Sequence, residues 1–327
     1  MQTPTNFPTP SFKTVLLATD FSEASETAFE TAIDLCKTLP ASLSILHVFE
    51  YNETVPPPQT GQPVGFEALY QEAERSLNHL LQTARHSGVP SNAEIAGGLA
   101  VATILETAAK QKTDLLILGT NAARGLERLV FGSTAEAVLR KASCPVITVG
   151  PRVRKSGNDA SRPVIFATDF HPTTIHAVRY AASVCSATQS PLHCLTVLPM
   201  SADAGAQSQI VPQVMTEALR HVAVSSGTVI SPPVCRTICG ADFPDTVIQY
   251  AKKECARMIV LGVQHAPAFV SHGPRDATYR LIVEAPCPVL TMAAPPKQSE
   301  AADGHESEPS SHQNLQAAWL KRRTRVA

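Results

Sequence analysis

The chain has 327 residues, a formal net charge of −1, and 44% hydrophobic but only 5% aromatic residues. This length is enough for two ordinary domains. A nearly neutral chain with no long block of one charge does not attract nucleic acid through bulk electrostatics. The sequence has no apolar run of membrane-spanning length, and its start, MQTPTNFPTPSFK, lacks the apolar core of a signal peptide. We therefore expect a cytoplasmic protein that binds neither nucleic acid nor a membrane.

The first half of the chain alternates apolar runs with amphipathic segments. The apolar runs predict strands at residues 13–19, 43–49, 93–96, 115–118 and 146–149. Apolar residues at helical spacing predict helices at residues 22–39, 66–86, 102–112 and 133–141. The inner face of the second of these helices is expected to carry Leu69, Ala73, Leu77, Leu80 and Leu81. Strands that alternate with helices imply a parallel, doubly wound sheet with right-handed crossovers.

The second half of the chain repeats the first. The segment VIFATDF, which starts at Val164, matches VLLATDF, which starts at Val15, and CPVLT near the end matches CPVIT at Cys144. This duplication predicts two five-stranded α/β domains in tandem, at residues 13–149 and 163–292. The polar stretch 150–162 is expected to be a linker. Residues 293–327, rich in Pro, Ser, Glu, Gln and His, are expected to form a disordered tail.

The last part of the first domain has the character of an anion site. Gly119 ends a predicted strand, and Gly132 precedes Ser133-Thr134-Ala135-Glu136, a capping-box pattern with Ser133 as the expected N-cap. A helix N-terminus presents free N–H groups to an anion. Gly132 lets the backbone approach a ligand closely, and Ser133 adds a hydroxyl donor.

These residues resemble the universal stress protein family, whose ATP-binding members carry G-x2-G-x9-G-[S/T]. Gly119, Ala122, Gly132 and Ser133 occupy those positions, so alanine replaces the second glycine. The opening strand, which ends in Asp20, is also similar to that of the family. The resemblance implies Rossmann-like domains of the adenine nucleotide alpha hydrolase-like type, and ATP, with or without Mg²⁺, as the ligand. The binding residues that it implies are Ala18, Thr19, Asp20, Val48, Gly119, Asn121, Ala122, Gly132, Ser133 and Thr134.

Two residues near this site also have purely structural interpretations. Asp20 could cap the following helix or stabilise a turn, a role that is compatible with ligand binding. His47, near the end of a strand, is interpreted as a hydrogen-bonded core histidine.

The second domain departs from the glycine pattern. It keeps Gly262, but His265, Arg275 and Asp276 stand where the first domain has Ala122, Gly132 and Ser133. A carboxylate at Asp276 can cap a helix, yet it would repel a bound phosphate. We therefore expect nucleotide binding to be confined to the first domain.

The sequence offers little for catalysis or metal binding. It contains no C-x2-C pair, no Walker-type lysine after a glycine loop, and no recognisable acid/base or nucleophile constellation. Most of the eight cysteines are interpreted as small buried hydrophobes, with a thiol switch as the alternative.

Three functional hypotheses follow. The first is a stress-response protein that binds an adenine nucleotide in its first domain and acts as a regulatory or interaction module with an unidentified protein partner. The alternative is an interaction or scaffold protein of the same fold that binds no nucleotide. The third, a slow ATPase, has the least support, and no enzyme activity is assigned.

The two domains are also expected to pair with each other. The apolar strand from Val146 to Val149 and the one from Val289 to Met292 would each leave an open backbone edge if its domain stood alone. Pairing these edges predicts one compact unit with approximate twofold symmetry.

Overall fold

The computed structural model describes residues 10–50, 64–120, 132–153, 159–168, 177–199, 213, 216, 232–263 and 277–293. The predicted tail apart from Ala293, which ends the last strand, and residues 121–131, which include Asn121 and Ala122, lie outside these ranges, as do Asp169, His265, Arg275 and Asp276. The strands are β1 (Thr14–Thr19), β2 (Ser42–Phe49), β3 (Ser91–Gly97), β4 (Leu115–Gly119), β5 (Val146–Val149), β6 (Val164–Ala167), β7 (Leu192–Leu198), β8 (Val234–Cys239), β9 (Met258–Val263) and β10 (Val289–Ala293). The helices are α1 (Glu23–Thr38), α2 (Val64–His86), α3 (Ala100–Lys110), α4 (Ser133–Lys141), α5 (Val178–Thr188), α7 (Phe243–Lys253) and α8 (Ala277–Glu284).

All ten strands form one sheet in the order β3-β2-β1-β4-β5-β10-β9-β6-β7-β8. Within each half every neighbouring pair of strands is parallel, for example β1 with β2 and β4, and β6 with β7 and β9. This is the doubly wound α/β fold that the alternation of strands and helices predicts, present twice.

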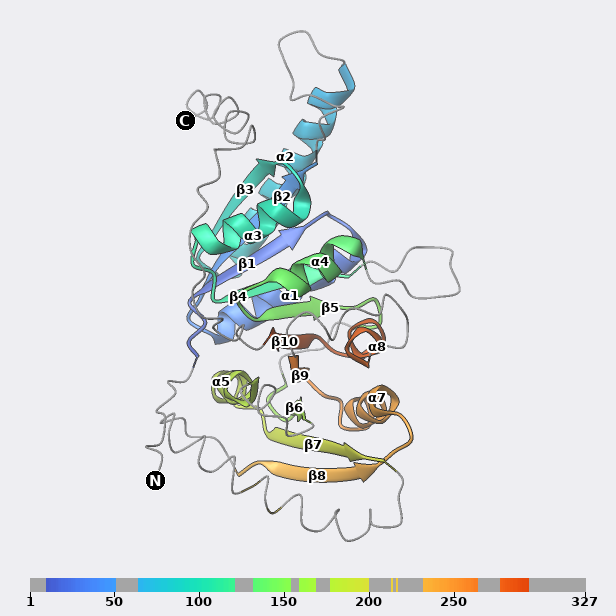
Figure 1. Ribbon diagram of the computed structural model, residues 1–327. Coiled ribbons are helices and arrows are strands. Elements are labelled where there is room, and N and C mark those ends of the chain that lie inside the picture. Colours follow the sequence, from blue (N-terminus) through green and yellow to red (C-terminus); the bar gives the residue numbers. More distant parts are fainter. Residues whose placement is uncertain are drawn as a thin grey trace, which may run out of the picture.

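The two halves meet where β5 pairs with β10, and this pair is antiparallel (Figure 1). Ile147 lies opposite Leu290, and both side chains are fully buried. The Thr148 hydroxyl donates to the Val289 carbonyl, and the Thr291 hydroxyl donates to the Val146 carbonyl, each at 3.2 Å. The strands that the sequence analysis expected to pair therefore lie side by side, related by an approximate twofold axis.

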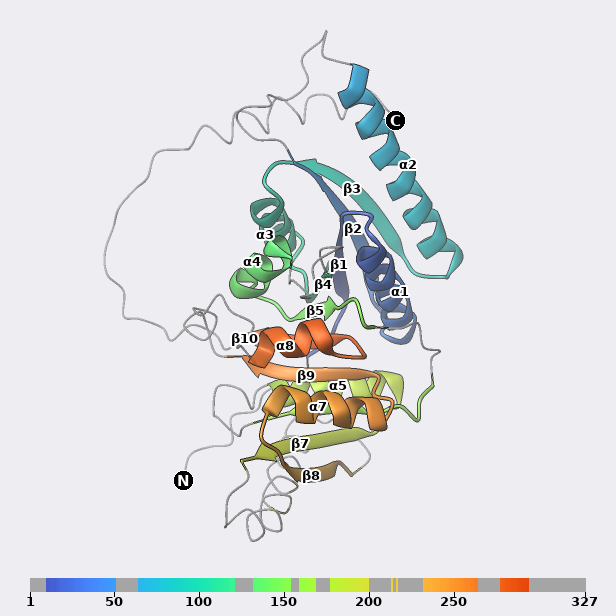
Figure 2. The same ribbon diagram turned by 90° about the vertical axis from the view of Figure 1, so that its right-hand side faces the viewer.

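The helices cover both faces of this sheet. One hydrophobic cluster joins α1, α2 and α5 to one face, and a second joins α3, α4, α7 and α8 to the other, as Figure 2 shows for the first half. The inner strands β1, β4, β5 and β6 are buried on both faces, which explains their continuous apolar sequences, whereas the edge strands β3 and β8 are largely half-exposed. In the part of the chain that the structure describes, no helix combines the length and apolar character needed to cross a membrane.

Two local expectations are wrong. Leu69 was expected inside, but its side chain is 63% exposed, because α2 packs through Ala73, Leu77 and Ala84, and Leu69 lies before this stretch. Strand β3 runs from Ser91 to Gly97 and is longer than expected, because it pairs with β2 along its whole length. Its polar residues Asn92 and Glu94 interrupt the apolar run, so the sequence predicts a shorter strand.

Candidate functional site

A cavity of about 250 Å³ lies at the carboxyl ends of β1, β2 and β4. In doubly wound sheets, ligands bind at this edge. The side chains and backbone atoms around the cavity come from three strands, the start of α1, α3 and the first turn of α4. The lining residues are Ala18, Thr19, Asp20, Ser25, Leu46, Val48, Glu50, Ala100, Ile104, Leu118, Gly119, Thr134 and Ala135.

The site residues expected from the sequence fall into three groups. Those in the wall of this cavity are Ala18, Thr19, Asp20, Val48, Gly119 and Thr134. Gly132 and Ser133 lie next to it, at the start of α4. Asn121 and Ala122 belong to the segment outside the described residues.

Asp20 organises the turn between β1 and α1. One of its carboxylate oxygens accepts hydrogen bonds from the Ser22 and Ser25 hydroxyls, both at 2.6 Å, and from the Ser22 backbone N–H at 3.0 Å. Burial would raise the pKa of this carboxyl, but the hydrogen bonds outweigh that effect and lower the pKa below its usual value. The N-cap of α1 is Ser22 rather than Asp20. Asp20 is thus a turn carboxylate that stays ionised and still borders the cavity.

The residue after Asp20 adopts a strained backbone conformation. Phe21 has φ of 60°, a left-handed value that bulky side chains rarely adopt. Its ring lies 4.4 Å from the His47 ring, centroid to centroid, and the His47 Nδ1 atom lies 2.8 Å from the Thr19 carbonyl oxygen. Burial lowers the pKa of His47, although this hydrogen bond and the charge of Asp20 oppose the shift. His47 is therefore a hydrogen-bonded and partly buried histidine that supports the turn carrying Asp20.

The first turn of α4 differs from its expected capping box. Gly132, not Ser133, is the N-cap, and its carbonyl accepts the first helical hydrogen bond from the Glu136 N–H at 3.0 Å. Glu136 pairs with Arg140 along the helix at 2.7 Å instead of reaching back to the cap. The N-cap glycine has no side chain to offer, and among the described residues no side-chain cap of this helix is found. The N–H groups of its first turn therefore have no acceptor within the helix, and this end of α4 borders the cavity.

The two glycines of the pattern have different structural roles. A Cβ atom on Gly119 would lie 2.6 Å from the backbone of Ala24 and Ser25, so glycine is needed there for α1 to pack against β4. A Cβ atom on Gly132 would meet nothing within 4 Å, and its φ of −61° suits any residue. The fold explains Gly119, whereas the packing of the described residues does not require glycine at position 132.

Several cavity residues were not found from the sequence, and Glu50 matters most among them. Its carboxylate accepts a hydrogen bond from the Ala100 N–H at 3.2 Å and so caps α3, whose own N-cap, Leu99, makes no side-chain bond. Glu50 follows the last residue of β2, at the carboxyl edge where ligand-binding residues gather. This position at the end of β2 is the only signal in the sequence that could have marked Glu50 as a cavity residue. The residue at this place in the second half is Pro199.

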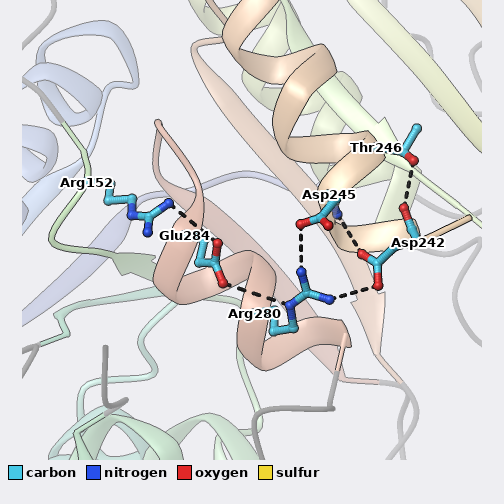
Figure 3. A network of polar contacts seen from close by, with 6 residues as sticks. All are labelled: Arg152, Asp242, Asp245, Thr246, Arg280 and Glu284. Atoms are coloured by element: carbon cyan, nitrogen blue, oxygen red, sulfur yellow. Dashed lines mark hydrogen bonds and ion pairs between the residues drawn. The ribbon is translucent and has the colours of Figure 1, made fainter. Parts of the chain in front are cut away.

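In the second half, α7 and α8 are the counterparts of α3 and α4. An ion-pair network joins these two helices (Figure 3). The Arg280 guanidinium contacts Asp242, the N-cap of α7, at 2.8 Å and Asp245 at 2.6 Å. Glu284 lies 3.9 Å from Arg280 and 3.5 Å from Arg152, which follows β5. The counterpart of Arg280 in α4 is Ala137, counted from the shared Cys-Pro-Val sequences. An arginine therefore clamps α7 to α8, while the helices beside the cavity carry alanine at that place.

A larger groove, of about 440 Å³, lies between α1 and the second half. Two arginines line it, but both already bind backbone carbonyls. Arg162 donates to Cys255 and Ala256 at 2.9 and 2.8 Å, and Arg257 donates to Asp159 at 2.7 Å. These contacts hold the end of the connecting segment against the second half, so we regard the cavity at the strand ends as the better candidate. Among the described residues, no cluster of three or more His, Cys, Asp or Glu side chains could hold a metal ion.

Comparison with known proteins identifies the fold. The sequence model of the universal stress protein family matches residues 11–150 and again residues 160–293. The chain belongs to this family. A universal stress protein of Methanocaldococcus jannaschii is 33% identical over 139 residues, which cover 42% of this chain and 82% of that protein. One from Thermus aquaticus is 32% identical over 139 residues, which cover 42% of this chain and 98% of that protein.

A solved structure extends the similarity to both repeats. The crystal structure of a universal stress protein from Archaeoglobus fulgidus aligns with a TM-score of 0.67 at 20% identity, covering 86% of this chain and 98% of that one. At this level of identity the similarity concerns the fold. This chain is thus a universal stress protein with the family domain in tandem, and we call its two halves the first and second repeats.

Proposed function

We propose that the first repeat binds an adenine nucleotide, ATP with or without Mg²⁺, in the cavity at the ends of β1, β2 and β4. Occupancy would then regulate how this stress-response protein interacts with a protein partner. The observation that carries the proposal is the meeting of Asp20, Gly119 and Thr134 in one cavity wall, because these residues are far apart in sequence. The resemblance pointed to Gly119 through the glycine pattern and to Asp20 through the opening strand.

The charges around the cavity suggest how the ligand would be oriented. Asp20 and Glu50 supply carboxylates that can accept hydrogen bonds from ribose hydroxyls or an exocyclic amine but would repel phosphates. The N-terminus of α4, whose N-cap is a glycine without a side chain, supplies N–H donors and a favourable helix dipole for an anion. The nucleoside would therefore lie toward Asp20, and the phosphates toward Gly132.

The size of the cavity fits this division. About 250 Å³ is close to the lower end of small-molecule pockets, which hold about 300–1,000 Å³. The space suits a base and its sugar, and a polyphosphate would extend past the start of α4. The second repeat would act as a structural partner or regulatory surface, because its sequence puts Arg275 and Asp276 where the first has Gly132 and Ser133.

Isothermal titration of the full chain with ATP, AMP and cyclic AMP, with and without Mg²⁺, tests the proposal. Gly132→Asp is the informative variant, because aspartate is a good N-cap and keeps α4 stable while its charge opposes phosphate. Ala68→Asp adds the same charge on an exposed part of α2 and serves as the control.

Binding that disappears in Gly132→Asp and persists in Ala68→Asp supports the proposal. Equal affinity in Gly132→Asp and the unmodified chain would move the site elsewhere. No binding of any nucleotide by the unmodified chain would contradict the proposal and favour an interaction protein that works without nucleotide.

A further inference from the structure

The second repeat contains a pair of thiols that the first repeat lacks. Cys194 in β7 lies directly opposite Cys235 in β8, in the register of two parallel strands. At the same positions of the first repeat, Ile45 in β2 lies opposite Ala93 in β3. The fold therefore forms equally well around an apolar pair, and the two cysteines are not required for packing at this place.

The positions of the two cysteines suit a disulfide. Neighbouring strands lie about 4.7–4.9 Å apart, and opposite residues of a parallel pair point to the same face. Disulfides join Cα atoms about 4.4–6.8 Å apart, so this spacing lies within the usual range. Their Cβ atoms need to be about 3.8 Å apart, which requires the strands to approach slightly. Because β8 is the last strand of the sheet, it can move without disturbing a second ladder.

The surroundings make the two thiols chemically unequal. Cys194 is fully buried, whereas Cys235 is partly exposed at the edge of the sheet. Cys235 accepts a hydrogen bond, at 3.3 Å, from the Thr216 hydroxyl. The neighbouring Cys194 thiol is the main reason why the pKa of Cys235 falls to about 6, although burial opposes the shift. Thiolates are the reactive form of cysteine, so Cys235 is set up to react first.

We infer that Cys194 and Cys235 form a reversible disulfide in which Cys235 reacts with hydrogen peroxide and Cys194 resolves the product. In the first step the Cys235 thiolate attacks the peroxide, the O–O bond breaks, and water leaves after proton uptake. Cys235 is oxidised to a sulfenic acid and the peroxide is reduced. In the second step the Cys194 sulfur attacks the Cys235 sulfur, the S–O bond breaks, and the hydroxide leaves as water with the Cys194 proton. This site is independent of the nucleotide proposal and lies in the other repeat.

The test uses the reduced full chain, treated with hydrogen peroxide, alkylated, and mapped by mass spectrometry without reduction. We expect a Cys194–Cys235 link, the loss of two of the eight thiols, and their recovery with dithiothreitol. Cys194→Ser should leave Cys235 as a sulfenic acid that dimedone traps. Cys235→Ser should leave Cys194 reduced.

The control is the double variant Cys194→Ile with Cys235→Ala, which installs the pair found in the first repeat. It should keep the fold, as judged by circular dichroism, and lose no thiols under the same treatment. The inference is overturned if the unmodified chain links other cysteines, such as Cys185 with Cys194. It is also overturned if Cys235 proceeds to sulfinic acid while Cys194 stays reduced, or if the double variant loses as many thiols as the unmodified chain.

Discussion

Alanine substitution at Gly119 and at Gly132 should separate the glycine that the fold needs from the glycine that a ligand needs. In Gly119→Ala the new Cβ atom would lie 2.6 Å from the backbone of Ala24 and Ser25. Ordinary contact begins at about 3.4 Å, so α1 and β4 must separate by roughly 0.8 Å. The obstacle is helix backbone, which cannot rotate away as a side chain can.

The magnitudes for the two variants differ clearly. Overpacking of this kind costs about 1–3 kcal/mol, so Gly119→Ala should lower the free energy of unfolding by that amount. In Gly132→Ala the Cβ atom meets nothing. Alanine is a poorer N-cap by about 0.5–1 kcal/mol, but it also reduces the entropy of the unfolded chain, worth about 0.4–1 kcal/mol. The net change at position 132 should stay within about 0.5 kcal/mol.

Urea unfolding followed by circular dichroism measures both stabilities, and titration with ATP measures binding. We expect a lower unfolding midpoint for Gly119→Ala at an unchanged slope, and an unchanged midpoint for Gly132→Ala with weaker ATP binding. The steric reasoning is refuted if Gly119→Ala is as stable as the unmodified chain. A large loss of stability in Gly132→Ala would show that position 132 is constrained by packing after all.

Three further predictions concern other parts of the molecule. Arg280→Met should lower the free energy of unfolding by about 1 kcal/mol, and by less at high salt, because its partners are partly exposed; urea unfolding at two salt concentrations measures this. Burial lowers the pKa of His47 in the folded chain, so the stability that neutral His47 contributes should be complete above about pH 6.5 and should be lost as the pH falls through its folded pKa. His47→Phe should flatten this part of a curve of unfolding free energy against pH. A variant curve that matches the unmodified one would contradict this prediction. Ile147→Lys places a charge opposite Leu290, so X-ray scattering should show two separate lobes, whereas Leu69→Lys on the exposed part of α2 should leave the compact profile of the unmodified chain.

Most of the fold could be predicted because its signals are local. Strands buried on both faces are continuous apolar runs, and the duplication shows most of these runs twice, as at Val15 and Val164. The wrong prediction for Leu69 also has a physical cause. Leu69 has helical spacing with Ala73 and Leu77, but spacing alone cannot show where α2 stops contacting the sheet.

The candidate site was only partly accessible from the sequence. Gly119 and Asp20 belong to recognisable patterns, whereas Glu50 has no pattern of its own and reaches the cavity because β2 lies beside β1. The capping box misled because a serine followed by a glutamate three residues later satisfies the pattern, while in the structure Glu136 pairs with Arg140. The opposition of Cys194 and Cys235 likewise depends on strand register, which the sequence does not specify.

The junction between β5 and β10 helps to explain how the repeats could diverge. Each of these strands supplies the hydrogen-bond partners that the other would otherwise lack. The five strands of each repeat therefore have no open edge where the two repeats meet. Because the pair is antiparallel, the carboxyl ends of the strands in the two repeats point in opposite directions. These two sets of strand ends therefore lie at opposite edges of the sheet. The second repeat can accommodate the Arg280 ion pairs, and the first can keep its cavity, without either change weakening the shared sheet.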